Sequence, residues 1–386
     1  MPKSVGIITI QSANYGSTLQ MFALYTIVNK LGYNCTIIDY QYPTKYHRQN
    51  SIGNENKYSQ NILNPQVLIR KIGNLYKRII RSIIKKKYPS NNLTNAFNEF
   101  ISQCHTTSIS YDKDSIIKNP PLFDIYMTGS DQVWNPRYYH RDYSFLLNFT
   151  KDKQKRVSYA SSFGTKQFIE AYKDDYSKLL KRYDFVSTRE RSGVALYEQL
   201  TGRKADYCLD PTMLLTKEEW KKYATPYTNK NERYILCYIQ SYAFNPYPYI
   251  DKLIKRVKKI TGYKVKIITQ DFYEETKGYE VQYNVGPREF IDLYYNASFI
   301  IACSFHAIVF SIIMRKPFFT VINDKPTNDD RQTNIISEFG LEKRAYKKGD
   351  KLPQKKEELI LDYNDIEKKI ENLRESSMQY LKKILA

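Results

Sequence analysis

The sequence has little cysteine and no long apolar run, and each shortage excludes a class of protein. Its five cysteines are odd in number and include no C-x-x-C pair, so neither a disulfide framework nor a cysteine zinc site is expected. The most apolar stretch, 299–314, contains polar residues and falls short of the roughly 18 apolar residues of a membrane span. The amino terminus lacks the pattern of a signal peptide. We therefore expect a cytoplasmic protein.

Common motifs for phosphate and metal binding are also missing. The chain has no G-x-G-x-x-G after a strand and no G-x-x-x-x-G-K-[ST], so ordinary dinucleotide binding and P-loop phosphoryl transfer lose their main support. Asp112 and Asp114 form a D-x-D, but its polar surroundings are more typical of surface charge, and the four histidines are far apart in sequence. No metal site is expected.

Acidic residues are few relative to basic ones. The 386 residues include 60 Lys and Arg against 40 Asp and Glu, a formal net charge of +20, and 42% are hydrophobic. The length suits two domains, and the composition excludes disorder of the whole chain. Segment 42–88 holds eleven Lys and Arg against one Glu, which is half of the net charge.

The basic insertion at 45–88 contains a helical pattern. Apolar residues recur every three or four positions from Leu68 to Ile83, and the cations fall mostly off this face. A helix over 65–88 either lies on an anionic membrane surface, as a peripheral contact at the inner face of the cytoplasmic membrane, or packs with a solvated basic face. No nucleic-acid partner is expected, because no nucleic-acid fingerprint is present.

The periodicity of the chain predicts an α/β fold. A strand at 4–10, a helix at 17–31 and a strand at 34–40 form a β-α-β unit, and further strands are predicted at 123–127, 157–160, 185–188, 234–240, 264–269, 299–303 and 318–321. We expect two Rossmann-like domains facing a cleft, over 1–212 and 213–345, and a charged, solvated helical segment over 346–386. In such sheets ligands bind beyond the carboxyl ends of strands.

The turn after the first strand holds Asn14, Gly16 and Ser17. The backbone N–H groups at the start of the following helix favour an anion. A plain helix cap made by Asn14 or Ser17 explains the same residues, and both interpretations stay open.

The loop after the 123–127 strand is rich in polar groups. Asp131, Gln132, Trp134 and Asn135 stand together there, which favours hydrogen bonding to a polyol with the indole as an aromatic platform. The alternative is a structural turn with Trp134 in the core.

Two further strand ends carry residues suited to chemistry. Arg189 follows the 185–188 strand and can grip a carboxylate or phosphate with two parallel hydrogen bonds, or pair with Glu190 instead. His306 opens an apolar helix after the 299–303 strand. Histidine is the side chain best suited to proton transfer near neutral pH, although a histidine on an apolar face is usually a core residue.

Several motifs in order along the chain together resemble the polysaccharide pyruvyl transferase family. The match runs over about 4–342 and rests on N-Y-G-S at 14–17, G-S-D-Q-V-W at 129–134, S-Y-A-S-S-F-G at 158–164, R-E at 189–190, L-D-P-T at 209–212, S-F-H at 304–306, P-F at 317–318 and the stretch from Arg331 to Leu341. The resemblance implies a two-domain fold similar to GT-B glycosyltransferases. It also implies transfer of the enolpyruvyl group of phosphoenolpyruvate onto two hydroxyls of a sugar, which forms a pyruvate ketal and releases phosphate.

The resemblance implies roles for individual residues. The family's histidine corresponds to His306 and its donor-binding arginine to Arg189, with Arg331 near the same cleft. The family commonly has Gly where this chain has Ala307, and some members carry Arg in place of Ser304.

From the chemistry that the resemblance implies, we expect the following roles for the site residues. His306 is the catalytic acid and Asp131 the base. Arg189, Arg331, Ser304, Gly16 and Ser17 bind the donor, and Asn14, Gln132, Trp134 and Asn135 bind the acceptor. Apart from phosphoenolpyruvate as donor substrate, no cofactor is expected.

Three functions are compatible with these features. The first is a pyruvyl transferase of capsule or other surface-polysaccharide synthesis, with the donor on the 213–345 domain and a sugar or lipid-linked saccharide on the 1–212 domain. The alternative is a GT-B glycosyltransferase that uses a nucleotide sugar. A non-catalytic polyanion-binding protein is suggested by charge alone.

Overall fold

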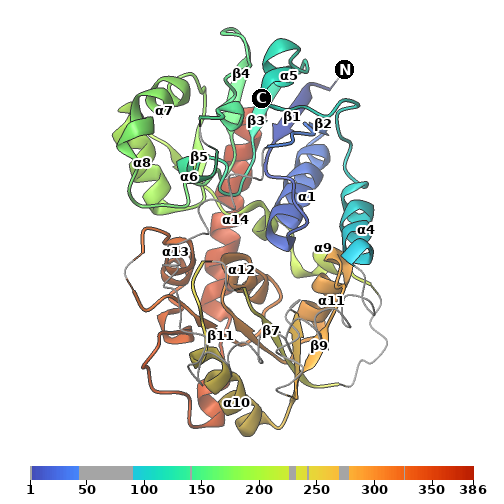
Figure 1. Ribbon diagram of the computed structural model, residues 1–386, viewed down its shortest axis with the longest axis vertical. Helices are drawn as coiled ribbons and strands as arrows, with labels where there is room; N and C mark the ends of the chain where they lie inside the picture. Colours follow the sequence, from blue (N-terminus) through green and yellow to red (C-terminus); the bar gives the residue numbers. More distant parts are fainter. Residues whose placement is uncertain are drawn as a thin grey trace, which may run out of the picture.

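The computed structural model describes residues 2–42, 90–139, 141–225, 232–240, 243–268, 278–325 and 327–386. The basic insertion predicted at 45–88 lies outside the described residues, so its helix and its membrane contact stay predictions. Two sheets lie one above the other along the longest axis of the molecule (Figure 1). No helix in the described ranges is long and apolar enough to cross a membrane.

The amino-terminal sheet is parallel and has the strand order β2-β1-β3-β4. Alternate residues of β1 point to opposite faces: Val5 and Ile7 share a core with helix α1, whereas Ile8 belongs to a separate core on the other face. A small parallel sheet of β5 and β6 continues this domain. The elements are β1 (Ser4–Ile8), α1 (Tyr15–Lys30), β2 (Asn34–Ile37), α4 (Ser90–Ile101), α5 (Lys113–Lys118), β3 (Ile125–Thr128), α6 (Pro136–Tyr139), β4 (Lys155–Ser158), α7 (Lys173–Leu180), β5 (Ser187–Thr188), α8 (Arg191–Thr201) and β6 (Asp206–Tyr207).

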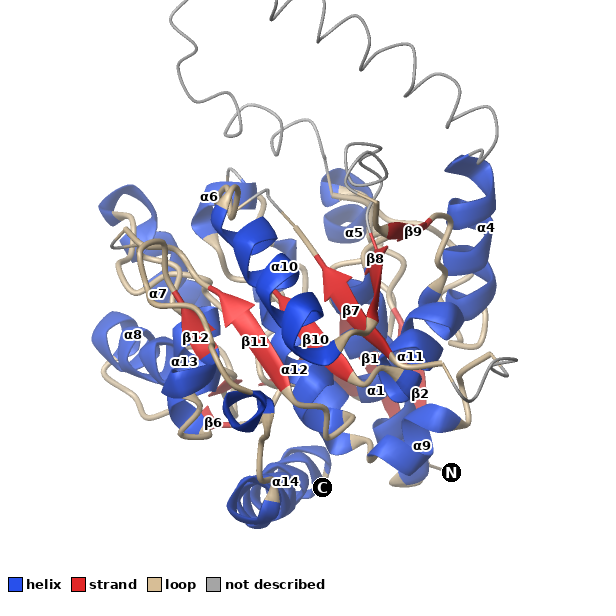
Figure 2. Ribbon diagram, turned by 90° about the horizontal axis from the view of Figure 1, so that it is seen from below, coloured by secondary structure: helices blue, strands red, loops and turns tan. Residues whose placement is uncertain are grey.

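The carboxy-terminal sheet is also parallel, with the order β12-β11-β10-β7-β8-β9. Figure 2 shows β7, β10 and β11 side by side and pointing the same way. Ile235 and Cys237 of β7 pack in one core with α10, while Leu236 and Tyr238 face α11 and α12. The elements are α9 (Lys217–Lys221), β7 (Tyr234–Tyr238), α10 (Tyr249–Thr261), β8 (Lys264–Ile268), β9 (Glu280–Gln282), α11 (Pro287–Asn296), β10 (Phe299–Ala302), α12 (Phe305–Ile313), β11 (Phe318–Val321), α13 (Arg331–Glu338) and β12 (Ala345–Tyr346).

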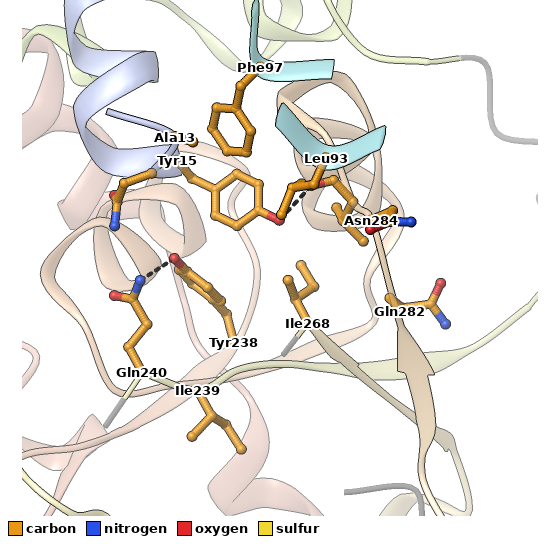
Figure 3. A pocket seen from close by; sticks show the side chains of 12 residues that line it. Ala13, Tyr15, Leu93, Phe97, Tyr238, Ile239, Gln240, Ile268, Gln282 and Asn284 are labelled. Atoms are coloured by element: carbon orange, nitrogen blue, oxygen red, sulfur yellow. Dashed lines mark hydrogen bonds between the residues drawn. The ribbon is translucent and has the colours of Figure 1, made fainter. Parts of the chain in front are cut away.

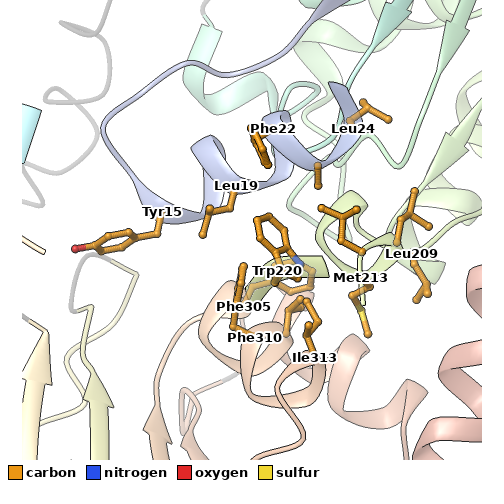
Figure 4. Packing of buried hydrophobic residues seen from close by; sticks show 14 of the residues in the cluster. Tyr15, Leu19, Phe22, Leu24, Leu209, Met213, Trp220, Phe305, Phe310 and Ile313 are labelled. Atoms are coloured by element: carbon orange, nitrogen blue, oxygen red, sulfur yellow. The ribbon is translucent and has the colours of Figure 1, made fainter. Parts of the chain in front are cut away.

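One hydrophobic core extends across the boundary between the two domains. Leu19 and Phe22 of α1 share it with Trp220, Phe305 and Phe310 from the second half of the chain (Figure 4). The ring centroids of Trp220 and Phe310 lie 5.4 Å apart. Helices from both domains therefore contribute to one core at the boundary.

The charged segment at 346–386 contains the long helix α14 (Asn364–Leu385), which returns to the amino-terminal domain (Figure 1). The expectation that this helix is solvated was wrong for one of its faces, because Leu381 and Ile384 are fully buried. Tyr380 donates a hydrogen bond to the carbonyl oxygen of Ser158 at 2.9 Å. Charged residues are exposed on the opposite face, which explains why composition alone suggested a solvated helix.

Candidate active site

A pocket of about 300 Å³ lies at the carboxyl ends of strands from both sheets. The predicted site residues that line it are Asn14, Ser17, Asp131, Gln132, His306 and Arg331. They come from the start of α1, the loop after β3, the start of α12 and the start of α13. Loops far apart in sequence meet here because parallel strands end at the same edge of each sheet.

His306 lies in the first turn of α12 and contacts a buried carboxylate. Its Nε2 is 3.5 Å from Oδ2 of Asp210, and its side chain is 11% exposed. Asp210 also accepts hydrogen bonds from the backbone N–H and the hydroxyl of Thr212. Burial raises the pKa of Asp210, but His306, Arg189 and Thr212 outweigh burial and hold that pKa well below its usual value. The negative charge of Asp210 thus lies beside Nε2 of His306, which has no hydrogen-bond partner among the described residues.

The other imidazole nitrogen of His306 lies against the start of α1. A Cβ atom at Gly16 would overlap the imidazole at Nδ1, so only glycine permits this approach. The backbone N–H of Gly16 already donates to Oδ1 of Asn14 at 2.9 Å. The cap interpretation of this turn therefore accounts for Asn14, while the close approach to His306 accounts for Gly16.

Asp131 is held in the pocket wall in a strained backbone conformation. Its φ is 73°, in the left-handed region that a non-glycine residue rarely adopts. Oδ2 accepts from the hydroxyl of Ser17 at 2.8 Å, and Oδ1 accepts from the backbone N–H of Gln132. Burial raises the pKa of Asp131, but the charges of Arg189 and His306 and the Ser17 hydrogen bond lower it below its usual value. Asp131 is consequently a weak, ionised base.

Arg331 supplies positive charge to the pocket from the start of α13. Its Nε and Nη2 donate to the two carboxylate oxygens of Asp329, at 2.9 and 2.6 Å. Burial raises the pKa of Asp329, and Arg331 more than reverses that effect. The guanidinium is thus fixed in orientation at the pocket edge, near the cleft where the family resemblance implied it.

Arg189 does not line the pocket, and the expectation that it grips the donor directly is not met by this structure. Its side chain is fully buried and donates to three carboxylates: Nε to Glu190 at 3.1 Å, Nη1 to Asp210 at 2.7 Å and Nη2 to Asp131 at 3.2 Å. Its guanidinium also lies 4.5 Å from the ring centroid of Phe305. The pairing with Glu190, left open from the sequence, is one part of this cluster.

Comparisons with known proteins show which family the chain belongs to. A family model described as polysaccharide pyruvyl transferase matches residues 14–325. This range contains all the residues that line the pocket except Ile10, Ser12 and Arg331. The chain belongs to the polysaccharide pyruvyl transferase family. It is therefore a transferase of polysaccharide biosynthesis, and the family implies a sugar acceptor.

The fold of this family member is that of GT-B enzymes. The structure is similar to that of UDP-GlcNAc 2-epimerase from Methanocaldococcus jannaschii in complex with UDP-GlcNAc and UDP, with 13% identity, a TM-score of 0.50 and coverage of 96% of this chain and 93% of the other. The structure is also similar to that of a protein assigned as UDP-N-acetylglucosamine 2-epimerase from Listeria monocytogenes. The identity is 11%, the TM-score is 0.50, and the match covers 97% of this chain and 91% of the other. At these identities the likeness shows the fold alone. No curated protein matches the chain.

In this pyruvyl transferase family member, five predicted site residues do not line the pocket: Arg189, Gly16, Trp134, Asn135 and Ser304. Trp134 is 0% exposed and donates its indole N–H to the carbonyl oxygen of Phe145, so the aromatic-platform prediction was wrong and the core alternative holds. Asn135 is buried and donates to Oε1 of Gln132 at 3.0 Å. Ser304 is the N-cap residue of α12, and its hydroxyl is buried without a hydrogen-bond partner among the described residues.

From the sequence, Asp210 had no predicted role and Glu190 only that of an alternative partner for Arg189, although both stand in the motifs that carried the resemblance. Burial raises the pKa of Glu190 to about 7, against the opposing charge of Arg189. Tyr42 and Tyr138 also line the pocket. The pattern that could have identified Asp210 is an Asp followed by Pro-Thr after a short strand. In the structure this Asp caps the 3-10 helix that follows.

Proposed function

We propose that this protein transfers the enolpyruvyl group of phosphoenolpyruvate onto two hydroxyls of a sugar, forming a pyruvate ketal and releasing phosphate. The observation that carries the proposal is that His306 and ionised Asp131 line the same pocket. Asp210 lies behind His306, with its Oδ2 3.5 Å from the imidazole Nε2. Family membership supports a pyruvyl transfer, and this pocket supplies an acid and a base for it.

The first step is protonation of the donor's methylene carbon by His306. The proton forms the new methyl group, and positive charge develops at the adjacent carbon, which is still bonded to carboxylate and phosphate. Asp210 stabilises the protonated imidazole before transfer and keeps its orientation. Because Asp131 is held ionised, it stabilises the developing positive charge.

Attack by the sugar completes the transfer in two steps. One hydroxyl adds to the cationic carbon and loses its proton to Asp131; a second hydroxyl then displaces phosphate, which leaves with the second proton. A weak base suffices for the first attack, because a hydroxyl bonded to a cationic carbon is strongly acidic. Arg331 and the amino-terminal end of α1 offer positive potential to the donor's anionic groups.

The acceptor we propose is a sugar of capsule or another surface polysaccharide, carried on a lipid at the inner membrane face. Its support is the charge of segment 42–88, eleven Lys and Arg against one Glu, since basic segments are attracted to anionic lipid. Co-sedimentation of the protein with anionic and neutral vesicles tests whether it binds such a membrane. Binding that does not depend on anionic lipid, or that survives deletion of 65–88, would refute it.

The experiment that tests the function measures phosphate released from phosphoenolpyruvate in the presence of candidate sugars, with mass spectrometry of the sugar product. His306→Ala should lower release at least about 100-fold, the lower end of the range for a general acid. His105→Ala is the matched control, because His105 is exposed. Tight binding of UDP or GDP with no binding of phosphoenolpyruvate would refute the proposal in favour of nucleotide-sugar transfer.

A further inference from the structure

A second pocket lies between the two domains and adjoins the catalytic pocket. It has a volume of about 200 Å³, and Asn14 lines both pockets. Its walls come from α1 and α4 on one side and from the carboxyl ends of β7, β8 and β9 on the other. A ligand in this second pocket would therefore lie next to a donor bound beside His306.

The two pockets differ in charge. The catalytic pocket contains Asp131, His306 and Arg331, whereas the described lining of the second pocket holds no Asp, Glu, Lys, Arg or His. Besides Asn14, its polar side chains include the carboxamides of Gln240, Gln282 and Asn284, and the remaining lining is aromatic or aliphatic. Carboxamides both donate and accept hydrogen bonds, which is the requirement for holding sugar hydroxyls.

The aromatic wall of the second pocket is fixed by contacts between the domains. Tyr15 donates its hydroxyl to the carbonyl oxygen of Val285 at 2.6 Å and stacks on Phe290 with ring centroids 4.3 Å apart. Gln240 donates to the hydroxyl of Tyr238 at 2.5 Å. In Figure 3, Gln240 lies on one side of the Tyr15 ring, and Gln282 and Asn284 lie on the other. Polar groups thus flank an apolar centre, as in pockets that orient small ligands.

We propose that the second pocket binds one uncharged sugar ring of the acceptor, an inference that rests on the proposed function. The lining formed by the described residues favours an uncharged unit, because it offers no cation to a phosphate or carboxylate. The volume of about 200 Å³ lies below the roughly 300–1,000 Å³ of pockets for drug-sized ligands, which suits one ring better than a nucleotide sugar. The acceptor ring would then lie against the carboxy-terminal sheet, opposite to the side expected from the sequence.

Saturation-transfer NMR on the full chain tests this subsite with a panel of methyl glycosides of glucose, galactose, mannose and their N-acetylamino forms. Gln240→Ala removes one carboxamide, and Gln282→Trp fills the pocket from the edge strand β9. Each should weaken glycoside binding about tenfold, the equivalent of 1.4 kcal/mol. Gln379→Trp is the control, since Gln379 is exposed on α14.

Binding of phosphoenolpyruvate, measured separately by calorimetry, distinguishes the two proposals. Unchanged glycoside binding in both pocket variants, or no binding of any panel member to the wild type, overturns the subsite. Glycoside binding that both variants lose, in a protein that does not bind phosphoenolpyruvate, supports the subsite and refutes the proposed function.

Discussion

Arg189 organises the charges of the active site while remaining out of contact with its pocket. One buried guanidinium bonds three carboxylates, on Glu190, Asp210 and Asp131. Two of these carboxylates then contact Ser17 and His306, which line the pocket. The planar fork of arginine can hold three partners at once, whereas lysine presents one compact charge. Arg189 is therefore a positioning residue.

Arg189→Lys should destabilise the protein by about 3–5 kcal/mol, the range for breaking a buried ion pair, because one ammonium group cannot bond all three carboxylates and the others would be left buried without a cation. Urea unfolding of this variant and of Arg191→Lys measures the effect. Arg191 is 59% exposed and pairs with Glu338, so its change should cost less than about 1 kcal/mol. Equal stability of the two variants would contradict the assigned role.

Glu190 should make stability fall as pH rises through the weakly acidic range. Burial raises its pKa from 4.5 to about 7 in the folded protein. Between these values the folded state binds more protons than the unfolded state, so stability decreases from about pH 4.5 to pH 7. Glu190→Gln removes this contribution. The free energy of unfolding of the variant, relative to that of the wild type, should therefore be higher at pH 8 than at pH 5. Urea unfolding at both pH values measures the difference, and a constant difference would contradict the raised pKa.

At the scale of elements, the site depends on two helix starts that face each other. The first turn of α1 carries Gly16, and the first turn of α12 carries His306, whose ring occupies the space a Cβ at Gly16 would need. Phe22 of α1 and Phe310 of α12 both pack on Trp220, with ring centroids 6.2 and 5.4 Å from it, within one core (Figure 4). The position of the imidazole therefore depends on the close approach of Gly16 to His306 and on the shared contacts of α1 and α12 with Trp220.

Gly16→Ala should displace the imidazole of His306 and lower turnover at least about tenfold while the protein stays folded. Elsewhere in a helix, Gly→Ala stabilises by about 0.4–1 kcal/mol when the backbone conformation is compatible. Steady-state phosphate release and thermal unfolding measure the two effects. A variant with higher stability and full activity would show that the two helices are free to separate here.

Most of these elements were predictable from the sequence, whereas the contacts between them were not. Apolar runs bounded by turn residues predicted β1, β7, β8, β10 and β11 to within two residues, because a buried parallel strand is apolar throughout. The two- and three-residue strands β6, β9 and β12 left no periodic signal. The local pattern around Trp134 and Arg189 is the same for a ligand-binding loop as for a buried one, so only tertiary packing decides between them.

At the scale of the whole molecule, the two domains should unfold together. They share one core, and α14 returns from the second domain to the first, where the backbone N–H of Leu209 donates to Ser377 and Lys3 donates to the carbonyl oxygen of Ala386. Leu381→Ala should lower stability by about 2–5 kcal/mol, as for other buried leucines. Calorimetry should show one transition at a lower temperature. Two separated transitions would contradict the shared core.

We propose that His306 protonates the donor carbon and that this carbon ends in a ketal on the sugar. The most direct measurement is NMR of the product formed from phosphoenolpyruvate labelled with ¹³C at its central carbon, in deuterated water. We expect a labelled ketal carbon on the sugar, one deuterium in the methyl group next to it, and no product with His306→Ala. Release of phosphate without labelled sugar, or full product formation by His306→Ala, would contradict it.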